Sequence, residues 1–113
     1  MSQETTIPLY GYVGAFAEDK NKAKEIRTRL IMPALGRNET VVLDFEKVNS
    51  ATQSFIHALI SEVIRQEGIA VLDKLFFKNC NNIVREIVNI VIEYLQDTPK
   101  ISDLPRNGNS SQD

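Results

Sequence analysis

The spacing of hydrophobic residues changes at one short polar turn in the middle of the chain. Residues 41–45 (VVLDF) form an apolar run interrupted only by Asp44, which is typical of a strand covered on both faces. From Thr52 to Arg65 the apolar residues recur at helical spacing and form one broad stripe: Phe55, Ile56, Leu59, Ile60, Val63 and Ile64. The pattern predicts a buried strand that leads through a polar turn into an amphipathic helix.

The first third of the chain predicts an edge strand and a helix. Residues 7–16 contain Pro8 and two glycines, so we expect an edge strand or an irregular hairpin there. Charged and apolar residues alternate over residues 18–32 with the spacing of one helical face. Pro33 disfavours helical geometry at the residue before it, so we expect this helix to end there.

The second half of the chain predicts a further strand and a last helix. Gly68 is expected to stop the helix that begins near Thr52. Residues 70–77 predict a third core strand. Residues 83–96 contain many β-branched residues, which suit a strand, but the length of the segment and the asparagines before it favour a helix.

Strands and helices therefore alternate along the chain. This order predicts an α/β fold with right-handed parallel crossovers and a sheet layered with helices. A length of 113 residues and a hydrophobic content of 42% fit one domain, which we place at residues 1–96 with a flexible leader at residues 1–5. Residues 97–113 are rich in proline, glycine and serine and predict a disordered tail.

Polar residues follow two of the expected strands. Because the carboxyl ends of parallel strands meet at one edge of a sheet, we expect residues 49–54 to lie near residues 79–82 in a polar rim, the usual place for a binding site. Gln53, His57 and Ser61 are each four residues apart and predict a polar stripe, which is either a docking surface or a solvated helix side. The candidate partner-binding residues are Asn49, Ser50, Thr52, Gln53, Ser54, His57, Ser61, Asn79 and Asn81.

The hydroxyl groups at the start of the helix have two interpretations. In the first, Ser50 and Thr52 serve only to cap the helix: Ser50 and Gln53 have the spacing of a capping box, in which the serine accepts from a helix amide and the glutamine reaches back. Alternatively, Thr52 or Ser54 accepts phosphate, since the amides and the dipole of a helix N-terminus stabilise an added negative charge.

The residues around this turn resemble the STAS-like proteins of uncharacterised function and, more distantly, the STAS domains of anti-sigma factor antagonists. The STAS-like pattern is Asp-Phe-x-x-Val, then a hydroxyl-rich turn and Ser-Phe, and this chain has DFEKV at residues 44–48 and TQSF at residues 52–55. The likeness extends from Val13 to Gln96. In the phosphorylated antagonists the first serine of the turn accepts phosphate, whereas Gln53 stands there in this chain and Ser54 matches the second serine.

The resemblance implies a small STAS-like sheet with helices mainly on one face. It also implies a regulatory module that binds a signalling protein or a histidine-kinase-type ATPase without performing chemistry itself. The alternative is a small-molecule or nucleotide sensor, in which Asn79, Asn81 and the hydroxyls near Thr52 converge on a polar ligand.

Composition narrows the possible functions. A net charge of −2 gives no electrostatic reason for binding nucleic acid, and no apolar run approaches the ~20 residues of a membrane span. The chain begins without a signal-peptide pattern and has one cysteine, so we expect a cytoplasmic protein. His57 and Cys80 are the only histidine and cysteine, and their spacing requires neither a metal site nor a catalytic pair. We expect no catalytic residue, no cofactor and no metal.

The last helix also bears on self-association. Ile92 and Tyr94 widen its apolar belt beyond one face, and such a belt could seal a dimer. We therefore expect a monomer or a weak homodimer.

Overall fold

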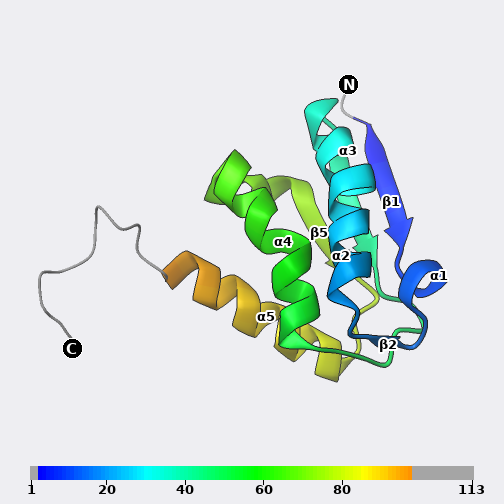
Figure 1. Ribbon diagram of the computed structural model, residues 1–113. Coiled ribbons are helices and arrows are strands. Elements are labelled where there is room, and N and C mark those ends of the chain that lie inside the picture. The colour runs from blue at the N-terminus through cyan, green and yellow to red at the C-terminus, as the bar shows by residue number, and fades with distance from the viewer. Residues whose placement is uncertain (1–2, 98–113) are drawn as a thin grey trace, which may run out of the picture.

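Three parallel strands form the main sheet of the computed structural model, which describes residues 3–97 (Figure 1). They are β1 (Glu4–Pro8), β3 (Thr40–Asp44) and β5 (Leu75–Lys78), in the order β1-β3-β5. A second parallel pair joins β2 (Phe16–Ala17) to β4 (Ser50–Ala51), with Phe16 opposite Ser50. The predicted α/β architecture with parallel crossovers is confirmed.

Alternation along the strands separates the two faces of the main sheet. Ile7 and Leu43 are neighbours in register and lie in the buried core. On the reverse face Thr6 is exposed, and so is Phe76, with 44% of its surface accessible. The helices therefore cover one face of the sheet, as predicted, and the outer strands are open on the other.

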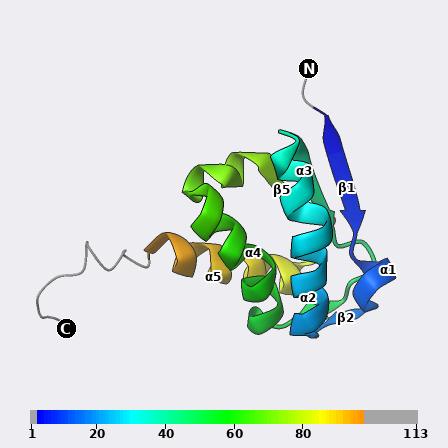
Figure 2. The same ribbon diagram turned by 45° about the horizontal axis from the view of Figure 1, so that its top comes forward.

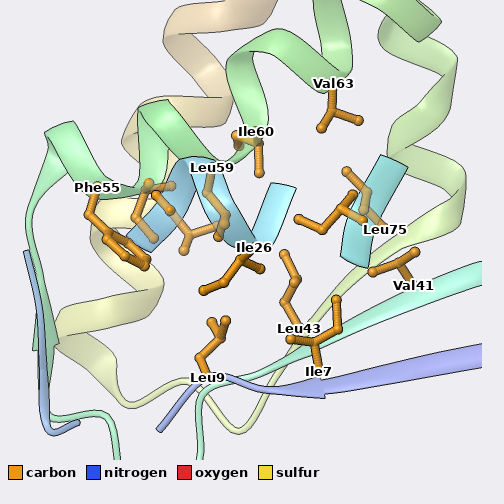
Figure 3. Packing of buried hydrophobic residues seen from close by; sticks show 14 of the residues in the cluster. Ile7, Leu9, Ile26, Val41, Leu43, Phe55, Leu59, Ile60, Val63 and Leu75 are labelled. Atoms are coloured by element: carbon orange, nitrogen blue, oxygen red, sulfur yellow. The ribbon is translucent and has the colours of Figure 1, made fainter. Parts of the chain in front are cut away.

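The core lies between the helices and this covered face. Figure 3 shows Leu59 and Ile60 of helix α4 (Gln53–Glu67) directed toward Ile26, with Ile7 and Leu43 of the strands on the other side of Ile26. All five side chains are at most 2% exposed. Burial of this kind supplies most of the free energy that drives folding.

The helix predicted at residues 18–32 does not end at Pro33. Helix α2 (Lys20–Ile26) runs into a π-helical turn, η1 (Arg27–Ile31), and then into α3 (Met32–Gly36), which has Pro33 in its first turn. In the π-helical turn the Met32 amide donates to the Arg27 carbonyl, five residues back. Such a turn widens the helix just where a proline ring would meet the carbonyl four residues back, so the proline is tolerated.

The helix after the polar turn, α4 (Gln53–Glu67), is confirmed, and so is its stop at Gly68, whose φ is 88°. The strand predicted at residues 70–77 is mostly wrong, because a 3₁₀ helix, η2 (Ile69–Lys74), occupies its first part and β5 begins only at Leu75. A short apolar run cannot distinguish a strand from a buried helical turn by periodicity alone.

The last helix, α5 (Asn82–Asp97), is confirmed and replaces the strand that its β-branched residues would also allow. Figures 1 and 2 show α4 between α2 and α5, and in both views the second half of α5 extends past α4. The tail predicted at residues 97–113 lies, beyond Asp97, outside the described residues.

The N-terminal segment contains one strand and a short helix. β1 is the edge strand that Pro8 predicts, and it begins at Glu4, inside the expected leader. The chain then turns through α1 (Tyr10–Val13), so the alternative of a hairpin is wrong. Among residues 3–97, no helix combines the length and the apolar character that a membrane span requires.

Candidate functional site

The loops that follow β3 and β5 are joined by side-chain hydrogen bonds. The Asn81 Nδ2 donates to the backbone carbonyl of Asn49 at 2.8 Å, and the Asn79 Nδ2 donates to the Asp44 Oδ1 at 2.9 Å. Residues 49–54 and residues 79–82 are therefore neighbours at the carboxyl edge of the sheet, as predicted.

Asp44 holds this edge together. Its Oδ1 also accepts from the Glu46 amide at 2.9 Å, and its backbone carbonyl accepts from the Leu9 amide at 2.9 Å. The hydrogen bond from Asn79, followed by that from Glu46, lowers the pKa of the Asp44 carboxyl below its ordinary value. In the sequence Asp44 stands out as the single charge in an apolar run and as the first residue of the STAS-like pattern, but neither feature predicts its partners Asn79 and Glu46.

The two asparagines of the second loop have structural roles. The Asn81 Oδ1 accepts from the Val84 amide at 2.8 Å and so caps the start of α5. Asn79 has a φ of 60°, a left-handed conformation that asparagine tolerates better than most residues. The amides of Asn79 and Asn81 already have partners within the chain, which weakens the alternative in which they converge on a ligand.

Thr52, not Ser50, caps α4. The Thr52 Oγ1 accepts from the Phe55 amide at 3.1 Å, whereas Ser50 lies in β4, and its amide donates to the Ala15 carbonyl at 3.3 Å. The capping box that the Ser50–Gln53 spacing suggested is wrong, because strand pairing with β2 holds Ser50 away from the first turn of the helix.

The predicted polar stripe on α4 is only partly exposed. Gln53 and His57 are exposed, but Ser61 is buried. Each step of four residues turns about 40° round a helix, so Ser61 lies about 80° from Gln53 and reaches the side that packs into the domain. Ser61 is therefore not part of a docking surface.

A groove borders the exposed end of α4. It has a volume of about 460 Å³ and lies between the starts of α2 and α4 and the second half of α5. Gln53, Ser54 and His57 all line it, and the His57 ring lies 6.2 Å from the Tyr94 ring. Its other lining residues are Lys20, Ala58, Ile90 and Val91.

Exposed aromatic side chains lie beside the rim. Phe16 is 48% exposed and lies opposite Ser50 in the β2–β4 pair. Tyr10 follows β1, and the Lys47 Nζ lies 5.8 Å from the centre of its ring. We name the exposed set the rim surface: Tyr10, Phe16, Lys47, Asn49 and Ser54. Neither Phe16 nor Tyr10 was predicted as a site residue. Their only signal in the sequence is that they are large side chains in a segment without helical or strand periodicity.

The single cysteine lacks the features of a nucleophile. Cys80 is half-buried, and burial raises the pKa of its thiol above the ordinary value, so the reactive thiolate is disfavoured at neutral pH. Within residues 3–97 no cluster of three or more potential metal-binding side chains is present.

The parallel sheet covered on one face by helices, with a strand–turn–helix junction at Asp44 to Thr52, defines the chain as a small α/β domain of the STAS-like class. A family model described as "STAS-like domain of unknown function (DUF4325)" matches residues 22–85. The chain belongs to this family, which confirms the resemblance. Comparisons with curated proteins and with solved structures found no match.

Proposed function

We propose that this protein is a non-enzymatic regulatory module that binds another protein through the rim surface and the exposed start of α4. The partner we infer is a signalling protein or a kinase-like ATPase, by analogy with STAS domains as binding modules. One observation carries the proposal: the side chains of Asn79 and Asn81 fix the loop after β5 to the end of β3 and to the loop that follows it, beside exposed aromatic side chains.

Rigid loops beside aromatic groups suit protein recognition. Preorganised loops lose little conformational entropy when they bind, and tyrosine is enriched among the residues that dominate binding energy. Phe16 and Tyr10 would supply apolar contact area, while Asn49 and Ser54 would supply polar contacts at its border.

We propose no enzymatic activity for this protein because of the state of the ionisable groups at the rim. The Asp44 carboxylate accepts two internal hydrogen bonds, and the pKa of the Cys80 thiol is raised. We further propose that the module acts in the cytoplasm, because a free thiol is ordinary in a reducing compartment.

Phosphate is the modification that we propose as the switch, with Ser54 as its acceptor. The Thr52 hydroxyl is half-buried and caps α4, whereas Ser54 is exposed in the first helical turn and borders the groove that contains Lys20. A phosphate there would be stabilised by the helix N-terminus and would add negative charge to the rim surface itself.

Peptide mapping by mass spectrometry, on the chain isolated from its own cells, tests this switch. We expect the added mass of phosphate on Ser54 and its loss in Ser54→Ala. Phosphate on Thr52, or an unmodified chain under every growth condition, would contradict the proposal.

Native mass spectrometry of gently isolated protein tests the proposed function itself. We expect a complex with a second protein, which the spectrum then identifies. A chain that carries only a small-molecule adduct would instead support the sensor.

A further inference from the structure

Helix α5 carries two apolar stripes, and only one of them is buried. The buried stripe packs into the core and consists of Val84, Val88 and Val91. The other stripe, which we name the outer stripe, has the spacing i, i+4, i+7 and i+11 and consists of Ile83, Ile87, Ile90 and Tyr94. Ile83 is 58% exposed, Ile90 is 39% exposed and Tyr94 is 60% exposed, whereas Ile87 is half-buried and packs against the core. Exposed apolar side chains that line one side of a helix typically mark an interaction surface.

The two edges of the outer stripe differ in charge. Successive residues turn by about 100°, which places Glu86 and Glu93 on one side of the stripe, where both are exposed. The buried stripe lies on the opposite side of the outer stripe. The edge on that side borders the groove, which Lys20 and His57 line. Asp19, beside Lys20, accepts from the Asn21 amide at 2.9 Å and caps α2.

The surface is complementary in charge to a second copy of itself, because one chain carries both the acidic edge and the groove with Lys20. A two-fold axis perpendicular to the helices would make the two α5 helices antiparallel and would place their acidic edges against each other. A two-fold axis parallel to the helices would make the two α5 helices parallel. The acidic edge of each chain would then meet the groove of the other, where Lys20 supplies an ammonium group. Only the parallel arrangement pairs opposite charges.

We propose that the outer stripe binds a second copy of this chain in a parallel two-fold dimer, with Glu93 of each protomer beside Lys20 of its partner. The apolar stripe provides the binding energy, and the exposed charge pairs set the orientation, since such pairs contribute little affinity. This inference goes beyond the proposed function and does not rest on it, because the outer stripe lies on α5; the two surfaces meet at the groove, which Ser54 and His57 of α4 also line.

Analytical ultracentrifugation of the full chain, from micromolar to millimolar concentration, tests the dimer. We expect a reversible monomer–dimer equilibrium whose dissociation constant rises about tenfold or more in Tyr94→Ser. Ile69→Ser is the matched control, because Ile69 is 45% exposed but lies on η2, and it should leave the constant unchanged. A wild-type chain that stays monomeric over the whole range, or an equal effect of both substitutions, would overturn the proposal.

A charge exchange tests the orientation. Lys20→Glu and Glu93→Lys should each weaken the homodimer a few-fold, and a mixture of the two variants should recover wild-type affinity, because each charge then again meets its opposite. In an antiparallel dimer Glu93→Lys would strengthen the homodimer, since the new lysine would face an acidic edge. That outcome, or a mixture no tighter than the separate variants, would overturn the parallel arrangement.

Discussion

Asp44 shows how one carboxylate at the end of a strand organises the candidate site. It accepts from the Asn79 side chain of one loop and from the Glu46 amide of the other, so a single side chain fixes the distance between the two loops. A position for which the sequence analysis offered no function is therefore the centre of the rim.

Asp44→Asn should make the protein less stable at neutral pH by about 1 kcal/mol, because hydrogen bonds to a carboxylate are stronger than those to an amide. The pKa of Asp44 is lower in the folded state than its ordinary 3.8. Its stabilisation is therefore present above pH 3.8 and is lost as the pH falls through the lower folded-state pKa.

Urea unfolding of wild type and Asp44→Asn, from about pH 7 down to about pH 3, measures this effect. The difference in the free energy of unfolding should shrink toward the acid end. Glu46→Gln is the control, because the Glu46 side chain is exposed, and it should follow wild type. A difference that is the same at every pH would rule out ionised Asp44 as its source.

The roles of single residues were the hardest to predict, because they depend on contacts with residues that are far away in the sequence. Ser50 fits a capping box by spacing, but its pairing with Phe16, more than thirty residues earlier, excludes it. Ser61 looks exposed by periodicity until the packed side of α4 is known. The role of Asp44 depends on Asn79, which is close in space and remote in the chain.

At the scale of elements, the prediction succeeded where the periodicity was long. The stripe of α4 and the length of α5 each gave the correct element, because many residues agree on one face. The helix end predicted at Pro33 was wrong, and the strand predicted at residues 70–77 was mostly wrong. A proline or a short apolar run is a weak signal that tertiary packing overrides. The π-helical turn and the 3₁₀ helix are the forms that this packing produced.

The start of α4 provides a direct check at this scale. Thr52→Ala should cost about 1 kcal/mol in the free energy of unfolding, because the Phe55 amide loses its acceptor. Ser50→Ala should cost less than about 0.5 kcal/mol, because the Ser50 side chain does not cap the helix. Chemical denaturation of both variants measures these free energies of unfolding. A larger loss of stability in Ser50→Ala than in Thr52→Ala would support the capping box and contradict this assignment.

At the scale of the whole molecule, exposed apolar groups occur on separate surfaces. Phe16 and Tyr10 lie at the rim, and the outer stripe follows α5, whose second half extends past α4 (Figure 2). The two surfaces meet at the groove, which is lined by Ser54 of the rim surface and by Lys20 and Tyr94. The STAS-like class was predictable from the strand–turn–helix junction, whereas these surfaces depend on how the elements pack.

The central claim is that the rim surface binds a protein partner. Isothermal titration of the partner identified by co-isolation, into wild type and into the double variant Phe16→Ser/Asn49→Ala, tests it most directly. We expect the double variant to lose about tenfold or more in affinity, because it removes an aromatic contact and a neighbouring polar one. Phe76→Ser is the matched control, since Phe76 is a similarly exposed aromatic residue on the reverse face of the sheet, and it should bind as wild type does. If the double variant binds as tightly as wild type, or if Phe76→Ser loses as much affinity, the rim surface is not the binding site.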